Sequence, residues 1–147
     1  MASYKIFDFD SRFRLGIEEV DKEHAKLVDI LNRVGQLLDE DSYRDAAEHF
    51  TENLSEYVNE HFANEEKFME SINYPDLETH KNAHKNFQDS FYELKPRIEQ
   101  YDEDAFRKSL LDTFLWLVSH TGKTDRDYAD YYRYLNLSNL SEFKKDQ

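Results

Sequence analysis

Histidine and acidic residues stand four apart at two places in the chain. His61 and Glu65 form the first pair, and His80 and His84 form the second. Because four residues make about one turn of an α-helix, the two side chains of each pair project from the same face. Imidazole and carboxylate groups bind transition metals such as zinc and iron. Each pair alone is weak evidence, since a His and a Glu four apart are usually a surface contact.

Both pairs stand within apolar stripes whose residues recur at intervals of three and four, as on the buried face of a helix. The first stripe contains Phe50, Leu54, Tyr57, Val58, Phe68, Met69 and Ile72, and the second contains Leu77, Phe87, Phe91, Leu94 and Ile98. A buried imidazole or carboxylate that lacks a partner is costly. A metal ion between the helices would satisfy these groups.

Two further predicted helices carry groups of the same kind. His24 lies in the stripe Val20, Leu27, Leu31, Val34 and Leu38, and His120 follows Phe106, Leu110, Phe114 and Leu117. Asp125 stands five residues beyond His120, and five residues turn a regular helix about 140° past the starting direction. If Asp125 faces the same site, we expect local overwinding or a π-bulge between the two, eased by Gly122, or a helix axis placed so that the two side chains reach the site from different sides. His49 lies about a third of a turn off the face of His61 and is predicted to be a surface residue.

The scarcity of helix-breaking residues predicts long helices. The chain has three Gly and two Pro among 147 residues, which disfavours a β protein. We expect helices from about 18 to 38, 43 to 71, 77 to 94 and 103 to 132. Asp41 or Ser42 is expected to cap the second helix and Asp76 the third, and Pro96 is expected to end or kink the third. Short connections between four such helices predict an all-α, up-down-up-down antiparallel four-helix bundle.

The whole chain, 1–147, is expected to form a single domain. Its parts are an N-terminal arm (about 1–18), the bundle (about 19–133) and a short polar C-terminal tail (about 134–147) with a short helix at 139–144. The arm lacks helical periodicity but contains Tyr4, Phe7, Phe9, Phe13 and Leu15. We therefore expect it to lie across the body, with Gly16 turning the chain into the first helix.

Composition disfavours several classes of function. The net charge of −13 argues against partners such as nucleic acid and anionic membrane surfaces. Without cysteine there is no disulfide, iron–sulfur cluster or thiol chemistry. No apolar run approaches the length of a membrane span, and the N-terminus has no signal-peptide core. We expect a cytoplasmic protein.

Seven inward-facing groups are predicted in all: His24, His61, Glu65, His80, His84, His120 and Asp125. A tetrahedral zinc site needs only four ligands. Two six-coordinate ions fit if both carboxylates and one solvent oxygen bridge them. The ion with three histidines is then filled, and the ion with two keeps one open position. Imidazole with carboxylate suits iron but does not exclude manganese, cobalt or zinc.

The chain resembles the hemerythrins, close to the single-domain bacterial hemerythrins (bacteriohemerythrins). The matching segments, within about residues 5–135, are Val20-Asp21-Lys22-Glu23-His24, His61-Phe62-Ala63-Asn64-Glu65-Glu66-Lys67-Phe68-Met69, Tyr74-Pro75, His80 to His84, Trp116-Leu117 before His120, and Asp125. The resemblance implies two iron ions per chain, bridged by an oxo or hydroxo group, Glu65 and Asp125. It implies further that His80, His84 and His120 hold the saturated iron, and that His24 and His61 hold the iron with the vacancy.

The resemblance also implies a function: O2 binding at the five-coordinate iron, for oxygen storage, delivery or scavenging, with peroxidase-like activity at most a side reaction. The corresponding O2 pocket consists of Leu27, Phe62, Trp116, Leu117 and Thr121. Ordinary core packing is the plainer interpretation of these residues. Most of them would both pack in the core and line the pocket. O2 is the expected partner of a monomer or small homo-oligomer.

Two positions depart from the family pattern. Phe7 and Phe9 lie near where bacterial members often have Trp, and Thr121 stands where many have Ile. The hydroxyl of Thr121 either reaches the pocket, where it can donate a hydrogen bond or move a proton, or bonds back to a carbonyl one turn earlier. Two other functions stay open, an O2 or redox sensor acting through a partner protein, and a di-iron enzyme acting on peroxide or nitric oxide.

Overall fold

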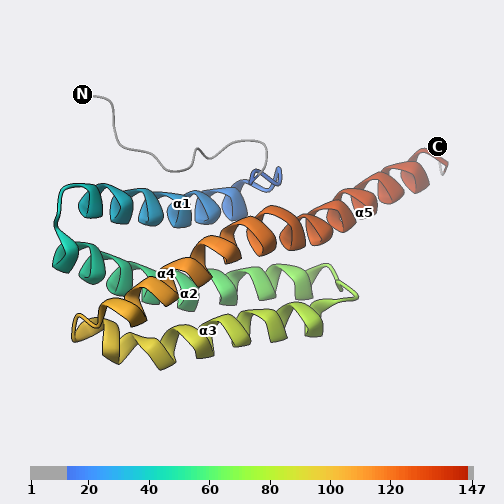
Figure 1. Ribbon diagram of the computed structural model, residues 1–147. Coiled ribbons are helices and arrows are strands. Elements are labelled where there is room, and N and C mark those ends of the chain that lie inside the picture. The colour runs from blue at the N-terminus through green and yellow to red at the C-terminus, as the bar shows by residue number, and fades with distance from the viewer. Residues whose placement is uncertain (1–12, 146–147) are drawn as a thin grey trace.

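The computed structural model describes residues 13–145, and side chains for residues 13–137, all of it in helices and their connections. The elements are α1 (Glu18–Asp39), α2 (Tyr43–Ser71), α3 (Leu77–Glu99), α4 (Glu103–Trp116), a π-helix η1 (Leu117–Thr124) and α5 (Asp125–Lys145). Figure 1 shows that α4, η1 and α5 follow one another as a single rod, so four rods make up the bundle. The predicted all-α four-helix bundle is confirmed. Within the described range, no helix is both long enough and apolar enough to cross a membrane.

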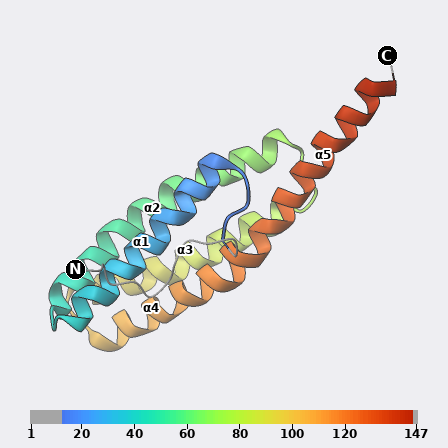
Figure 2. The same ribbon diagram turned by 90° about the horizontal axis from the view of Figure 1, so that it is seen from above.

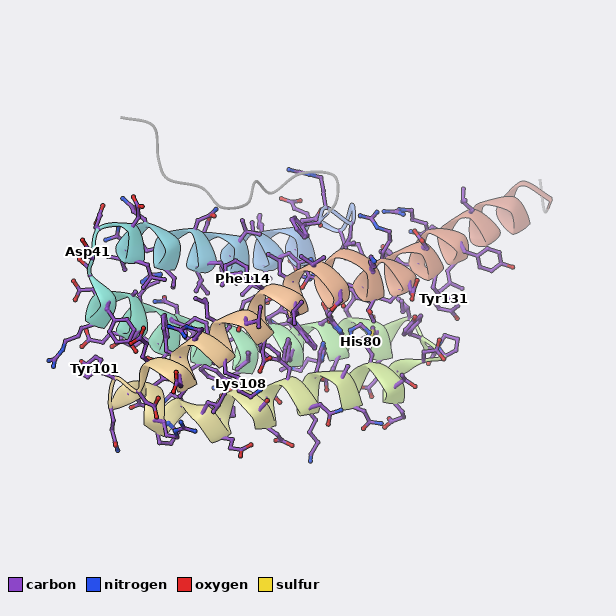
Figure 3. The ribbon with its side chains drawn as sticks, viewed as in Figure 1. Asp41, His80, Tyr101, Lys108, Phe114 and Tyr131 are labelled. Carbon is purple, nitrogen blue, oxygen red and sulfur yellow. The ribbon has the colours of Figure 1, made fainter. Side chains whose placement is uncertain are left out.

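Neighbouring rods pack through their apolar stripes. α1 packs against α2, α2 against α3, and α3 against α4, as seen from above in Figure 2. Around Phe50, the rings of Phe91 and Phe106 lie edge-on at centroid distances of 6.0 and 5.5 Å. Figure 3 shows Asp41 and Tyr101 at one end of the bundle and His80 toward the other. The main apolar cluster runs from Phe50 to Leu27, Phe62 and Leu117, and a second cluster contains Leu15, Val20, Met69, Tyr128 and Ala129.

The segment before α1 packs on the bundle as expected. Phe13 and Leu15 are buried, and Gly16 turns the chain with φ of +88°. The carboxylate of Asp21 accepts hydrogen bonds from the backbone N–H groups of Leu15, at 2.6 Å, and Gly16, at 3.0 Å. These bonds fix the turn into α1. The predictions for residues 1–12, including Tyr4, Phe7 and Phe9, lie outside the described residues.

The predicted end of the third helix near residue 94 is wrong. α3 continues through Pro96 to Glu99. Proline removes one backbone hydrogen bond, but the turn that contains it also carries Ile98, which is fully buried. Burial of that side chain holds the last turn of α3 on the core.

The expected capping by Ser42 and Asp76 is also wrong. Neither side chain makes a capping hydrogen bond. Their backbone ψ angles, 61° and 24°, differ from the extended conformation that directs an N-cap side chain at the following N–H groups. Asp102, with ψ of 109°, is extended and accepts a hydrogen bond from Ala105 N at 3.2 Å.

The polar tail predicted after about residue 133 is instead a helix continuous with the bundle. α5 runs without interruption from Asp125 to Lys145 and projects past the other helices in Figure 1. No Gly or Pro occurs after Gly122, so nothing in the sequence breaks the helix. Arg133 on this helix donates a hydrogen bond to the backbone carbonyl of Leu15 and so joins α5 to the segment before α1.

Candidate metal centre

All seven predicted groups come together inside the bundle. α1 supplies His24, α2 supplies His61 and Glu65, and α3 supplies His80 and His84, while His120 lies in η1 and Asp125 is the first residue of α5. Each of the seven residues is buried, with no more than 5% of its surface exposed. The inward orientation expected from the spacing is therefore present on every rod.

The π-helix explains how His120 and Asp125 reach the same site. Residues five apart are hydrogen-bonded in a π-helix and lie one turn apart. Accordingly, the backbone N–H of Asp125 donates to the carbonyl of His120. The irregular winding expected between these two residues is present, and Asp125 is completely buried.

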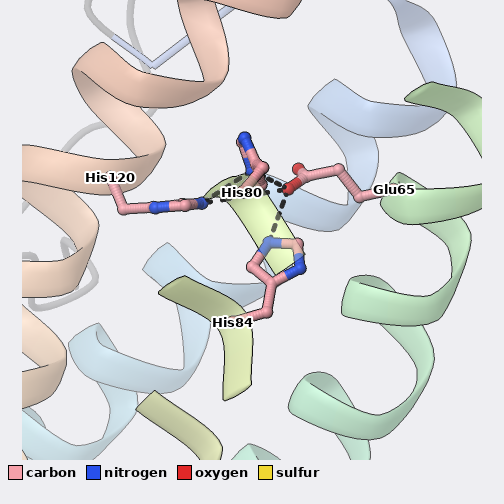
Figure 4. Close-up of side chains that lie close together, drawn as sticks. All are labelled: Glu65, His80, His84 and His120. Carbon is pink, nitrogen blue, oxygen red and sulfur yellow. Dashed lines mark hydrogen bonds and ion pairs between the residues drawn. The ribbon is translucent and has the colours of Figure 1, made fainter. Parts of the chain in front are cut away.

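The carboxylate of Glu65 lies between two sets of imidazoles. Its Oε1 is 2.9 Å from Nε2 of His80 and 2.8 Å from Nε2 of His84, and Figure 4 shows both contacts converging on that one oxygen. Its Oε2 is 3.1 Å from Nε2 of His61 and 3.4 Å from Nε2 of His24. The two oxygens of one carboxylate therefore face different sets of histidines.

Asp125 spans the same two sets. Its Oδ1 lies 2.9 Å from Nε2 of His80 and 3.0 Å from Nε2 of His120, and its Oδ2 lies 3.0 Å from Nε2 of His24. Two groups of potential metal ligands result: Glu65, His80, His84 and His120 in one, and His24, His61, Glu65 and Asp125 in the other. This is the arrangement expected of two carboxylates that bridge a pair of ions.

The spacing of the ligand atoms fits octahedral ions. In an octahedron with ligands about 2.0–2.1 Å from the metal, adjacent ligand atoms lie about 2.9 Å apart, whereas tetrahedral ligands at that radius lie about 3.4 Å apart. Most of the distances from Nε2 atoms to the two carboxylates are 2.8–3.1 Å, which suits adjacent ligands of an octahedral ion and is also the range of imidazole–carboxylate hydrogen bonds. Nε2 of His24 and both oxygens of Asp125 are buried, and their close polar contacts are with other members of the seven groups. Metal ions placed among these atoms would bind the imidazole and carboxylate groups that now face one another.

Residues 15–132 match the family model of the hemerythrin HHE cation-binding domain. The chain belongs to the hemerythrin family. A bacteriohemerythrin of Clostridium acetobutylicum is 33% identical over 129 residues, which cover 85% of this chain and all of that protein. A myohemerythrin of Theromyzon tessulatum is 27% identical over 122 residues, 83% of this chain and 90% of that protein. A hemerythrin-like protein of Naegleria gruberi is 30% identical over 122 residues, again 83% of this chain and 90% of that protein.

Two carboxylates outside the seven contact the far side of histidine rings in this hemerythrin site. Oε2 of Glu66 is 2.8 Å from Nδ1 of His84, and Oε2 of Glu23 is 3.2 Å from Nδ1 of His61. Such contacts fix the tautomer and orientation of metal-binding histidines. The sequence alone did not predict a role for Glu23 or Glu66, although each is the chain neighbour of a predicted ligand, and this adjacency was the available signal.

Tyr128 is a third contact that the sequence did not reveal. Its hydroxyl, fully buried, donates a 3.1 Å hydrogen bond to Oε2 of Glu65. Tyr128 lies three residues beyond Asp125, on the same side of the helix. The bond holds the Glu65 carboxylate between the two histidine sets.

The electrostatics of the metal-free hemerythrin pocket favour protonated imidazoles. Burial alone lowers the pKa of His24, but hydrogen bonding to Asp125 and Glu65 and their charges outweigh burial and raise the pKa to about 10. Burial also lowers the pKa of His80, but hydrogen bonding to Asp125 and Glu65 and their charges outweigh burial and raise the pKa to about 9. Burial and the charge of Glu65 raise the pKa of Asp125, but hydrogen bonds with His120, His24 and His80 prevail and lower it. A metal ion must therefore displace protons to bind.

Aromatic rings stack on two of the histidines. Phe62 lies parallel to His84, with ring centroids 4.0 Å apart and an angle of 2°, and Trp116 lies on His120 at 3.8 Å and 12°. Phe62 is buried, whereas Trp116 is partly exposed. Two of the predicted pocket residues therefore contact the imidazoles directly.

The other predicted pocket residues, Leu27, Leu117 and Thr121, are fully buried. The Oγ1 atom of Thr121 has no hydrogen-bond partner among the described residues. By contrast, Thr113 on α4 bonds back to the carbonyl of Ser109 at 2.8 Å. Of the two conformations considered for Thr121, the back-bonded one is therefore not observed.

His49 stands apart from both ligand groups. It is partly exposed, and its carbonyl accepts a 2.8 Å hydrogen bond from Asn53.

Proposed function

We propose that this chain binds O2 reversibly at a pair of iron ions held by His24, His61, Glu65, His80, His84, His120 and Asp125. One observation carries the proposal: both carboxylates contribute one oxygen to a set of three histidines and the other oxygen to a set of two. The set of three histidines would hold one ion and the set of two would hold the other, with Glu65 and Asp125 shared between them. An iron pair supplies the two electrons that reversible O2 binding requires.

The set formed by His24 and His61 has one histidine fewer, so O2 would bind on this side of the site. Neutral imidazoles stabilise ferrous iron, unlike the Glu-rich ligand sets of di-iron oxidases in ferritin-like bundles. Glu23 contacts Nδ1 of His61, and Glu66 contacts Nδ1 of His84. One histidine of each set therefore has a carboxylate on the ring nitrogen that faces away from the site. These contacts keep the Nε2 atoms directed at the ions.

The apolar wall protects the bound state from water. Leu27, Phe62 and Leu117 are buried beside the site, and the Trp116 ring covers His120. Excluding water from this pocket slows the proton delivery that would leave the iron pair oxidised. The buried hydroxyl of Thr121 is the exception in this wall, and it favours faster oxidation.

The test is a cycle of anaerobic iron loading, exposure to air and return to argon, followed by absorption spectroscopy. We expect two irons per chain and a charge-transfer band that appears in air and disappears under argon. A single bound zinc from an iron-replete preparation would contradict the proposal, and so would a band that air produces and argon does not remove.

A sensor is the second candidate function, and a specific contact favours it. Arg133 on α5 binds the carbonyl of Leu15, and α5 begins at Asp125. A change at the site could therefore move the segment before α1. Hydrogen exchange of residues 13–16 in the oxygenated and deoxygenated forms tests this, since a sensor requires the rates to differ.

We further propose that the protein acts in the cytoplasm as a monomer or small homo-oligomer. Its net charge of −13 supports a well-solvated, self-repelling surface. Light scattering at physiological salt measures the oligomeric state.

A further inference from the structure

Three tyrosine rings lie next to one another at the end of the bundle that holds the metal centre. Tyr128 and Tyr131 stand about one turn apart on α5, and Tyr74 lies in the connection between α2 and α3. The ring of Tyr74 contacts those of Tyr128 and Tyr131, at centroid distances of 6.3 and 5.5 Å. Figure 3 shows Tyr131 toward the same end of the bundle as His80. We call these three residues the tyrosine row.

The inner end of the tyrosine row contacts the metal centre at two points. The ring of Tyr128 lies 5.7 Å from the ring of His80, and its hydroxyl donates the 3.1 Å hydrogen bond to Oε2 of Glu65. Because the two oxygens of Glu65 face different histidine sets, this contact joins Tyr128 to both proposed ion positions. Tyr128 itself is fully buried, so a molecule in solution cannot reach it.

The outer end of the row reaches the surface. Tyr74 and Tyr131 are both partly exposed. Tyrosine is among the most easily oxidised side chains, and an exposed tyrosine that loses an electron can release its hydroxyl proton to water. Electron transfer weakens steeply with distance, so several short steps between oxidisable rings are faster than one long step. The row therefore connects a buried centre to water by short steps.

Two other aromatic side chains contact proposed ligands, but they fit this role less well. Tyr57 stacks on His61 at 4.8 Å, yet it is buried itself and its other ring neighbour is Phe62, which resists oxidation. Trp116 is partly exposed and stacks on His120, but its contacts are with one histidine set only. Trp116 is therefore the rival route, and the experiment includes it.

We propose that the tyrosine row carries electrons inward to the metal centre when hydrogen peroxide is reduced there, and so protects the ligand histidines from oxidation. Each peroxide takes up two electrons and two protons, its O–O bond breaks and two water molecules form. Tyr74 and Tyr131 each lose one electron and release the hydroxyl proton to water, which leaves two neutral tyrosyl radicals. Tyr128 loses an electron to the centre and regains one from Tyr74, so it ends each step unchanged.

Hydrogen peroxide is a stronger oxidant than a tyrosyl radical, so this transfer is favourable. The inference rests on the proposed iron pair, because a redox-active ion must pass the electrons on. Its test is the position of the radicals along the chain, which is independent of oxygen binding.

Radical position is measured with hydrogen peroxide and a nitroso spin trap added to the iron-loaded protein after oxidation in air. Peptide mass spectrometry then locates the trapped radicals. We expect adducts on Tyr74 and Tyr131 and few on Tyr92, which lies on α3 and is more exposed than either. Protein loaded with redox-inert zinc should give no adducts.

The variants interrupt the row at nearly constant ring volume. Tyr128→Phe should lower the adduct yield on Tyr74 and Tyr131 at least tenfold, and oxygen addition to His80 should rise in the same digests. Tyr74→Phe, which lies outside the contacts of Glu65, should lower the yield on Tyr131 by the same factor. Tyr92→Phe is the matched control and should change neither measurement.

Adducts on Tyr92 as abundant as those on the row, or the same yield with zinc as with iron, would overturn the proposal. Yields that do not respond to Tyr128→Phe and Tyr74→Phe, or that fall in Trp116→Phe instead, would do the same. Iron content and the oxygen-dependent band, measured without peroxide, test the di-iron function separately. A protein that keeps two irons and a reversible band but fails the labelling test refutes the tyrosine route alone, whereas a protein without two irons fails the di-iron function first.

Discussion

Loading the metal-free protein with metal at pH 7 should release at least two protons per chain. His24, with a pKa of about 10, and His80, with a pKa of about 9, are both charged at that pH in the metal-free pocket. Each must become neutral before its Nε2 can bind an ion. The apparent affinity should therefore rise about a hundredfold per pH unit near neutrality, or about 2.7 kcal/mol.

The proton count comes from calorimetry of anaerobic Fe(II) binding in several buffers that differ in ionisation enthalpy. The slope of the measured enthalpy against the buffer enthalpy gives the number of protons released. His49→Ala is the matched control, because His49 lies outside both ligand groups, and it should give the same slope. A release of fewer than one proton would refute the reasoning, because it would mean that the imidazoles are already neutral without metal.

Four further outcomes are expected. His61→Ala or Asp125→Ala should lose at least one of two irons by metal analysis, whereas His49→Ala should keep both; iron loss in the last would contradict the placement of α2. Thr121→Val removes the unpaired hydroxyl at nearly constant volume. Because one hydrogen bond of ~1–1.5 kcal/mol is at stake, Thr121→Val and Thr121→Ile should each slow autoxidation up to about tenfold. Autoxidation rates equal to that of the wild type would exclude proton delivery by Thr121. Tyr128→Phe should lower stability by about 1.5–3 kcal/mol in chemical denaturation, because it removes a bond to a buried carboxylate; an unchanged midpoint would show that the bond contributes nothing. Without metal, protonated His24 and His80 contribute fully to folding stability below about pH 6.5, and this contribution is lost as the pH rises through 9 to 10. The melting temperature of the metal-free protein should therefore fall over that interval. The metal-loaded protein should lose stability in acid instead, and melting temperatures that follow the same pH dependence in both forms would refute the linkage.

The site was more predictable from sequence than its surroundings were. Periodicity indicated inward orientation for His24, His61, His80 and His84, because the spacing of ligands on a regular helix is a local property. The five-residue interval before Asp125 predicted irregular winding, and the π-helix is that irregularity.

Contacts between rods could not be obtained in this way. Nothing in the sequence spacing shows that Glu23 meets His61, that Tyr128 meets Glu65 or that Tyr57 covers His61. These pairings depend on the rotation and depth of one helix relative to another, which packing of the whole core decides. The end of α3 was misjudged for the same reason, since burial of Ile98 outweighs the local effect of Pro96.

The π-helix also decides where the bundle would open first. Such winding is rare in proteins, where it occurs mostly as short bulges at functional sites. Segments of marginal local stability open before the rest of a structure does. Residues 117–124 contain the proposed ligand His120 and set the direction of the proposed ligand Asp125. Bound ions would therefore stabilise the π-helix in turn. The rate at which metal escapes should then be set by the unwinding of eight residues rather than by the strength of any single metal–ligand bond.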